Sequence, residues 1–138
     1  ATASAAKVDL VRSLGADEVI DYHAQDFANV ARDMDVVFDT IGGEVQEKSW
    51  GVLKPGGMLV SITDRPSEDR AKAMGKRAAY VFIGPNAAIL KELGQMVDLA
   101  QVRPLIAAEF GLDDTAKAQD LSETGRATGK IVIYAGHP

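Results

Sequence analysis

Cysteine is absent from this chain, which excludes disulfide bridges, thiolate catalysis and zinc sites built on cysteine. Histidine is scarce as well, since His23 and His137 are the only two and are too few for a metal cage. No apolar run approaches the roughly 20 residues that a membrane-spanning helix needs. We therefore expect no bound metal and no contact with a membrane.

Positive charge is in short supply. The 138 residues contain 15 Lys and Arg against 20 Asp and Glu, a formal net charge of -5 at pH 7. The basic residues are scattered, so no patch for a phosphate backbone is predicted and nucleic acid is not an expected partner. This composition is typical of a soluble globular domain, and we expect a cytoplasmic protein. Because the chain opens on Ala1 without a Met, we interpret it as a piece cut from a larger protein.

Helix-like and strand-like segments alternate along the first hundred residues. The spacing of apolar residues predicts helices at about 5–14, 26–32, 44–53 and 85–100. Ser4 is the expected N-cap of the first helix, and Pro85 is expected in the first turn of the last. Strands are predicted at 18–22, 34–39, 58–62 and 79–83, with a loop and one short helix in 63–76. This alternation, repeating roughly every 20 to 25 residues, indicates βαβ units in a doubly wound parallel sheet. The fold class is α/β.

The rhythm changes after Pro104. An extended run at 105–110 is followed by a helix at 113–124, for which Asp114 is a candidate cap, and by a strand at 130–134. The last third of the chain is therefore expected to leave the repeating sheet.

Several short segments stand in a fixed order: residues 1–7 (ATASAAK), 14–22 (LGADEVIDY), 35–43 (DVVFDTIGG), 53–60 (LKPGGMLV) and 129–133 (GKIVI). Each is weak alone, but the ordered set is specific and covers nearly the whole chain. In this order the chain resembles the medium-chain dehydrogenase/reductase family. The resemblance is stronger to the metal-free quinone oxidoreductases than to the zinc-type alcohol dehydrogenases.

The resemblance implies a partial Rossmann-type sheet. The family's first strand and glycine-rich loop would lie upstream of Ala1, and in the order 3-2-1-4-5-6 that strand is central. Residues 1–101 would then be the C-terminal part of a nucleotide-binding domain, and 102–138 a returning segment of the catalytic domain. Members of the family pair their sixth strands across a homodimer, so we expect the parent to be a homodimer through residues 80–83. This chain alone is expected to be inactive.

The resemblance also points to a cofactor. An acidic residue after the second strand accepts the ribose hydroxyls of NAD and would repel the 2′-phosphate of NADP, and this chain has Ser4 there. Taken alone, Ser4 is more simply a helix cap and Lys7 a solvated surface residue. Similar enzymes hold the 2′-phosphate with such a Ser and Lys and with a Tyr matching Tyr22. NADP is thus the implied cofactor.

Further cofactor contacts are expected where parallel strands end, because open α/β sheets bind ligands at the carboxyl ends of their strands. These candidates are Thr40, Ile41, Ile62, Thr63, Phe82 and Ile83. By itself Gly42-Gly43 reads equally as a flexible turn. Asp35 and Asp39 share a strand face at roughly 13 Å, too far apart to act together as acid and base. No catalytic residue is identified.

The implied function is that of an NADP(H)-dependent oxidoreductase that transfers hydride to a quinone, enone or carbonyl substrate. Two alternatives remain open. A Val- and Asp-rich strand followed by Leu-Lys-Pro-Gly-Gly is also typical of S-adenosylmethionine-dependent methyltransferases. A non-catalytic NADP-binding protein is possible too, because folds of this kind are reused without chemistry.

Overall fold

The structure, a computed structural model, describes residues 1–136, and His137 and Pro138 lie outside this range. The chain divides into two compact units, Ala1–Gly84 and Pro85–Pro138. The domain boundary expected after residue 101 concerns a larger protein and stays a prediction.

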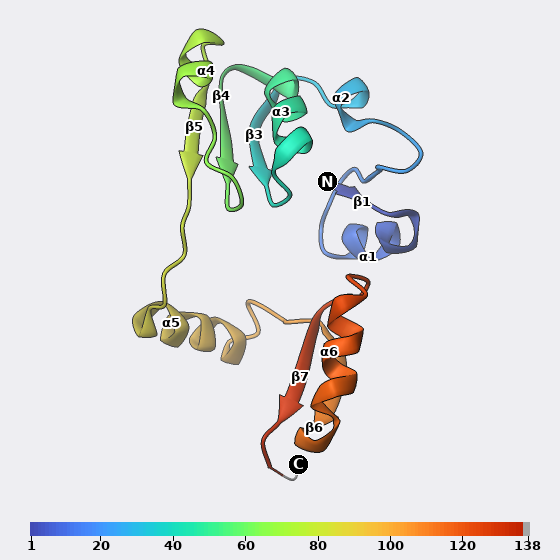
Figure 1. Ribbon diagram of the computed structural model, residues 1–138. Coiled ribbons are helices and arrows are strands. Elements are labelled where there is room, and N and C mark those ends of the chain that lie inside the picture. The colour runs from blue at the N-terminus through green and yellow to red at the C-terminus, as the bar shows by residue number, and fades with distance from the viewer. Residues whose placement is uncertain (137–138) are drawn as a thin grey trace. The chain divides into compact units, whose positions relative to one another are not determined.

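The first unit alternates strands and helices (Figure 1). Its elements are β1 (Thr2–Ala3), the 3-10 turn η1 (Ala5–Lys7), α1 (Val8–Ser13), β2 (Ile20–Asp21), α2 (Phe27–Val30), β3 (Met34–Asp39), α3 (Gly43–Val52), β4 (Leu53–Ser61), α4 (Glu68–Ala73) and β5 (Arg77–Tyr80). β1 pairs with β2, and β3, β4 and β5 form a second sheet in that order, with every pairing parallel. The predicted α/β class is confirmed.

One face of the β3–β4–β5 sheet carries the core of the unit. Trp50 of α3, Leu59 of β4 and Ala71 of α4 are buried together, and Val37 and Ala78 pack against them. Because side chains alternate along a strand, the neighbours of Val37 point to the opposite face. There Val36 and Phe38 stay 56% and 61% exposed. Parallel sheets usually bury both faces, so this sheet has a second apolar face with little cover from the described chain.

The two sheets of this unit do not join into one. β1 pairs only with β2 and β3 only with β4 among the described strands. A groove of about 250 Å³ lies between them, lined by Thr2 and Ile20 on one side and by Val36 and Phe38 on the other. This is the interruption expected between the second and fourth strands of the order 3-2-1-4-5-6.

Several element boundaries differ from the sequence expectation. The predicted helix 5–14 is a 3-10 turn followed by a six-residue α-helix. β4 begins at Leu53 rather than at Met58, and its ladder to β3 shifts register between Met34 and Val36. β5 ends at Tyr80, because its partner β4 ends at Ser61, the residue opposite it. Phe82 and Ile83 therefore follow the strand instead of ending it.

The second unit begins with α5 (Ala87–Asp98). Its N-cap is Asn86, so Pro85 precedes the helix and does not lie in its first turn as expected. The Asn86 side chain accepts hydrogen bonds from the N–H groups of Ala88 and Ile89. The remaining elements are β6 (Ile106–Gly111), η2 (Leu112–Asp114), α6 (Thr115–Glu123) and β7 (Lys130–Tyr134). β6 and β7 are parallel and α6 connects them, which makes this segment a small βαβ unit.

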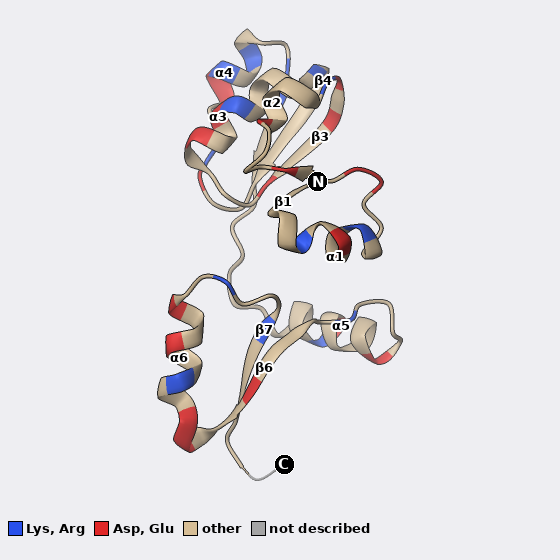
Figure 2. Cartoon of the chain, turned by 90° about the vertical axis from the view of Figure 1, so that its right-hand side faces the viewer, with Lys and Arg blue, Asp and Glu red and all other residues tan. Residues whose placement is uncertain are grey.

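Acidic and basic residues are mixed over the surface elements. Figure 2 shows both signs on α3, α4 and α6. Ion pairs link some of them, such as Lys48 with Glu44 one turn apart on α3 and Lys117 with Asp114 at the start of α6. Within residues 1–136 no helix is both long and apolar enough to cross a bilayer.

Candidate functional site

The carboxyl ends of β3, β4 and β5 are aligned. Asp39 is the register partner of Ser61, and Ser61 is the partner of Tyr80. One residue further on, Ile62 donates its N–H to the carbonyl of Asp39 at 3.2 Å and Val81 donates to the carbonyl of Ser61 at 3.0 Å. The loops that follow the three strands therefore emerge at one edge of the sheet. Thr40 and Ile41 leave β3 beside Ile62 and Thr63, which leave β4.

The carboxylate of Asp39 is the centre of this edge. It is only 3% exposed, and one oxygen, Oδ1, accepts from the N–H groups of Ile41 at 3.0 Å and Gly42 at 2.9 Å. The other oxygen, Oδ2, accepts from Gln46 Nε2 at 2.9 Å and from the Ser61 hydroxyl at 3.0 Å. The two oxygens have different roles. Oδ1 stabilises the turn after β3, and Oδ2 connects that turn to α3 and β4.

These contacts decide the charge of Asp39. Burial alone would raise its pKa, but the hydrogen bonds donated by Gly42, Gln46, Ile41 and Ser61 outweigh burial and hold the pKa of Asp39 below its usual value. The carboxylate is therefore ionised at neutral pH. With all four partners belonging to the protein, it is suited to organising the loops and unsuited to exchanging protons with a substrate.

Gly42 and Gly43 form a tight connection between β3 and α3. Both have positive φ, +82° and +53°, which L side chains rarely adopt. A Cβ on Gly42 would collide with Asp64 and Thr63, whereas one on Gly43 would meet open space. Gly43 donates its N–H to the Asp64 carboxylate at 2.8 Å. The glycine pair is thus a built turn packed against the loop after β4.

The β1–β2 pair forms a second edge of the same kind. Ala3 and Asp21 are register partners, and Tyr22 donates its N–H to the carbonyl of Ala3 at 3.2 Å. Ser4 and Tyr22 therefore leave adjacent strands side by side. Lys7 lies one turn further on and donates its N–H to the carbonyl of Ser4 at 2.8 Å. Strand pairing thus places Ser4 beside Tyr22, and a local turn places Lys7 three residues after Ser4.

The polar ends of the Ser4, Lys7 and Tyr22 side chains form no hydrogen bond or ion pair within the described residues. Ser4 occupies the N-cap position of η1, yet its hydroxyl makes no capping bond. In the described part of the chain the Lys7 ammonium forms no ion pair, and the Tyr22 hydroxyl, on a side chain that is 54% exposed, has no hydrogen-bond partner. The structure thus removes the simpler interpretation of Ser4 as a side-chain cap.

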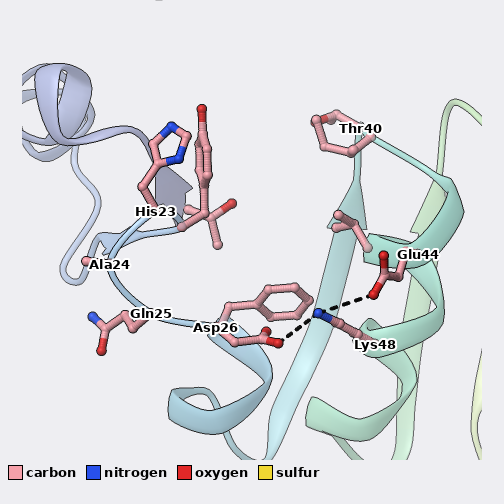
Figure 3. A pocket seen from close by; sticks show the side chains of 12 residues that line it. His23, Ala24, Gln25, Asp26, Thr40, Glu44 and Lys48 are labelled. Atoms are coloured by element: carbon pink, nitrogen blue, oxygen red, sulfur yellow. Dashed lines mark hydrogen bonds and ion pairs between the residues drawn. The ribbon is translucent and has the colours of Figure 1, made fainter.

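A pocket of about 650 Å³ opens between the two edges (Figure 3). Thr2, Tyr22 and His23 line it from the β1–β2 side, and Thr40 and Ile41 from the β3 side. The Tyr22 and His23 rings lie against each other with centroids 4.4 Å apart. Ser4 and Lys7 are not among the lining residues, and neither are Ile62 and Thr63.

A charged cluster closes one end of this pocket. Lys48 of α3 reaches Asp26 at 2.8 Å and Glu44 at 3.5 Å, as the dashed lines in Figure 3 show. The hydrogen bond from Lys48 lowers the pKa of Asp26, and that same bond raises the pKa of Lys48. Asp26 also caps α2 by accepting from the N–H of Ala28. The cluster therefore fixes α2 against α3.

The structure separates the expected site residues into three groups. Ser4 and Tyr22 lie at the β1–β2 edge with Lys7 in the turn that follows, and the β3–β4 edge carries Thr40, Ile41, Ile62 and Thr63. Phe82 and Ile83 lie beyond β5, at 80% and 72% exposure, and form no part of either pocket.

Sequence reasoning overlooked the polar residues behind the β3–β4 edge. Asp39 was considered only as an acid or base, and Gln46, Ser61 and Asp64 were not considered. A signal was available in Asp39 itself, because an Asp that ends an apolar strand before a glycine pair can fold the turn through its own side chain. The partners Gln46, Ser61 and Asp64 had no comparable signal.

The donor set for metal is poor. Across residues 1–136 no group of three or more His, Asp or Glu side chains could hold a metal ion, and the chain has no cysteine. The described residues therefore do not fit a zinc site.

The model of the zinc-binding dehydrogenase family matches residues 14–133. The chain belongs to this family. The match confirms the resemblance to medium-chain dehydrogenases/reductases, and it extends over most of both units.

Individual relatives agree with the family. The 2-methylene-furan-3-one reductase of Solanum lycopersicum is 35% identical over 97% of this chain and 32% of its own length. The chloroplastic NADPH-dependent alkenal/one oxidoreductase of Arabidopsis thaliana is also 35% identical, over 97% of this chain and 33% of its own length. The quinone oxidoreductase structure from Coxiella burnetii is 32% identical with a TM-score of 0.83, covering 98% of this chain and 44% of that one. The chain thus spans about a third of the length of these two curated relatives.

Proposed function

We propose that this chain is part of an oxidoreductase that uses NADPH to reduce an enone or quinone, with residues 1–101 in its nucleotide-binding domain and 102–138 a returning segment of its catalytic domain. The observation that carries the proposal is the group of uncommitted polar side chains at the β1–β2 edge. Ser4 and Tyr22 offer hydroxyl donors and Lys7 offers a cation, and no carboxylate stands where one would bind the ribose of NAD. Such a set suits the 2′-phosphate of NADP.

The remaining contacts would come from the strand ends. Thr40 and Ile41 would border the cofactor where β3 ends, Ile62 and Thr63 where β4 ends, and Phe82 and Ile83 after β5. The cofactor supplies hydride from its nicotinamide ring, and the residues of this chain bind and orient it. The relatives named as a furanone reductase, an alkenal/one oxidoreductase and a quinone oxidoreductase support a conjugated carbonyl or quinone as the acceptor.

The two alternatives are less well supported. A methyltransferase sheet usually ends in an antiparallel hairpin, whereas β5 runs parallel to β4 and is followed by the helix α5. Membership of a dehydrogenase family also favours the oxidoreductase. A non-catalytic NADP-binding protein would bind NADPH without turnover, so steady-state kinetics on the full-length protein separates it from the reductase.

For the full-length protein we further propose a homodimer located in the cytoplasm. The support is an acidic, cysteine-free chain and an exposed apolar segment after β5. We also propose that it acts on a small molecule and does not bind nucleic acid, since its basic residues are interspersed with acidic ones.

The test is a comparison of NADPH and NADH in the full-length protein. We expect the wild type to favour NADPH. Lys7→Ala should reduce the ratio of NADPH affinity to NADH affinity by about tenfold, the usual scale for a lost charged hydrogen bond. Tyr22→Phe should reduce that ratio by a few-fold, the usual scale for a lost neutral hydrogen bond. Lys72→Ala, an exposed lysine in α4, is the matched control. Equal use of both cofactors by the wild type, or an unchanged ratio in Lys7→Ala, would contradict the proposal.

A further inference from the structure

The loops after β3 and β4 are connected by a closed circuit of hydrogen bonds. Asp39 Oδ1 accepts from Gly42 N–H, and Asp39 Oδ2 accepts from Gln46 Nε2. The same Gln46 nitrogen donates to the carbonyl of Asp64 at 2.9 Å, and the Asp64 carboxylate accepts from Gly43 N–H. The circuit therefore runs from β3 through α3 to the loop after β4 and back to the glycine pair.

A branch of the circuit reaches Thr63. The Ser61 hydroxyl donates to Asp39, and its oxygen accepts from the N–H of Thr63 at 3.2 Å. The Thr63 hydroxyl lies 3.2 Å from the same oxygen. Thr63 is thus held by a side chain that is itself held by Asp39.

The buried part of the circuit leaves little freedom. Asp39, Gln46 and Ser61 are all buried, so the loss of one partner leaves polar groups without water to replace it. The loop after β3 and the loop after β4 are consequently held in a fixed position relative to each other. A small displacement of such loops is costly for hydride transfer, because the rate depends closely on the distance and alignment of the reacting atoms.

We propose that Asp39 is a positioning residue for hydride transfer, whose Oδ2 acts through Gln46 and Ser61 to hold the loop of Thr40 and Ile41 in one fixed place relative to Thr63, the arrangement that orients the dinucleotide. Asp39 does not touch the cofactor in this assignment. The inference rests on the proposed NADPH-dependent reduction. It adds that the link through Oδ2 between the two loops, and not the turn formed through Oδ1, sets the alignment of the reacting atoms.

The two oxygens can be tested separately in the full-length protein. Asp39→Asn keeps a carbonyl oxygen for Ile41 and Gly42 but places an amide where Oδ2 accepts from Gln46, so it breaks the link between the loops. Gln46→Met removes the bonds from Gln46 to Oδ2 and to the carbonyl of Asp64, and it leaves Asp39 and its bond from Ser61 intact. Glu47→Gln is the control, because Glu47 lies on the same helix and pairs with Arg70, away from both loops. The assays are NADPH binding, steady-state reduction of methyl vinyl ketone and benzoquinone, and the primary isotope effect with 4-deuterated NADPH.

We expect Asp39→Asn and Gln46→Met to lower kcat/KM by about 10- to 100-fold, the loss that misplaced reacting groups produce. The fall should lie more in kcat than in NADPH affinity, the isotope effect should rise because hydride transfer becomes more rate-limiting, and Glu47→Gln should match the wild type. Wild-type kinetics and isotope effects in either folded variant, with only the melting temperature lowered, would overturn the inference while leaving the proposed function intact. If Asp39→Asn does not fold, Gln46→Met decides alone. A wild type that neither binds nor oxidises NADPH would overturn the proposed function and this inference with it.

Discussion

Ser61 donates its hydroxyl to Asp39 at 3.0 Å, and the two residues are also register partners at the carboxyl ends of β4 and β3. One is 0% exposed and the other 3%, so the bond is shielded from water. A buried carboxylate of this kind must remain charged to keep its donors satisfied. The stability of the strand ends is therefore linked to the protonation of Asp39.

The first prediction concerns the stability of the protein at acidic pH. The pKa of Asp39 is lowered in the folded state, so its contribution to stability is complete above the unfolded pKa of about 3.9 and is lost as the pH falls through the lower folded pKa. We expect the unfolding midpoint in urea to fall more steeply below about pH 4 in the wild type than in Asp39→Asn, which has no proton to gain there. Parallel curves for the two proteins would contradict this linkage.

The second prediction compares the two glycines before α3. Gly42→Ala should lower the unfolding free energy by about 2–4 kcal/mol, because the methyl group meets Asp64 and Thr63 and the backbone has positive φ. Gly43→Ala has φ of +53° and meets open space, and it should cost only about 1–2 kcal/mol. Gly42 is more demanding because its φ of +82° and ψ of -166° lie in a region that is essentially restricted to glycine. Urea denaturation measures both, and equal costs would contradict the special demand placed on Gly42.

The third prediction is self-association through the segment 80–83. The segment follows the edge strand β5, and Val81, Phe82 and Ile83 are all exposed. An exposed apolar segment that continues from an edge strand invites pairing with a second copy. We expect the full-length protein to be a dimer by light scattering, and Val81→Lys to shift it toward monomer at low micromolar concentration. A wild type that stays monomeric at high concentration would count against this interface.

The fourth prediction is that the chain of residues 1–138, taken alone, is not a working reductase. Within residues 1–136 one edge of β1 and one edge of β3 have no strand partner, and Val36 and Phe38 of β3 expose apolar surface. Each buried unpaired backbone group costs about 1–3 kcal/mol, against a usual total stability of about 5–15 kcal/mol. We expect no measurable NADPH binding by calorimetry and no quinone reduction. Micromolar binding with turnover would refute the prediction, whereas a stable fold with neither would support it.

Local sequence signals determined the order and type of the main elements. The run from Met34 to Asp39 is β-branched and apolar and forms β3 with the predicted bounds, and the strand predicted at 130–134 is β7. Both segments carry their own propensity and pattern, so no distant partner is needed to recognise them.

Tertiary structure decided where strands end and what the polar residues do. β5 stops at Tyr80 because β4 offers no further partner, a limit set by register and invisible in the apolar run that continues to Ile83. Likewise, Asp39 acquires its role only when strand pairing places Ser61 opposite it and when α3 brings Gln46 to its second oxygen. Sequence spacing determines which residues share a strand or helix face. Contacts between residues 7 and 22 positions apart depend on how those elements pack, and here that packing makes a buried carboxylate the connection between two loops.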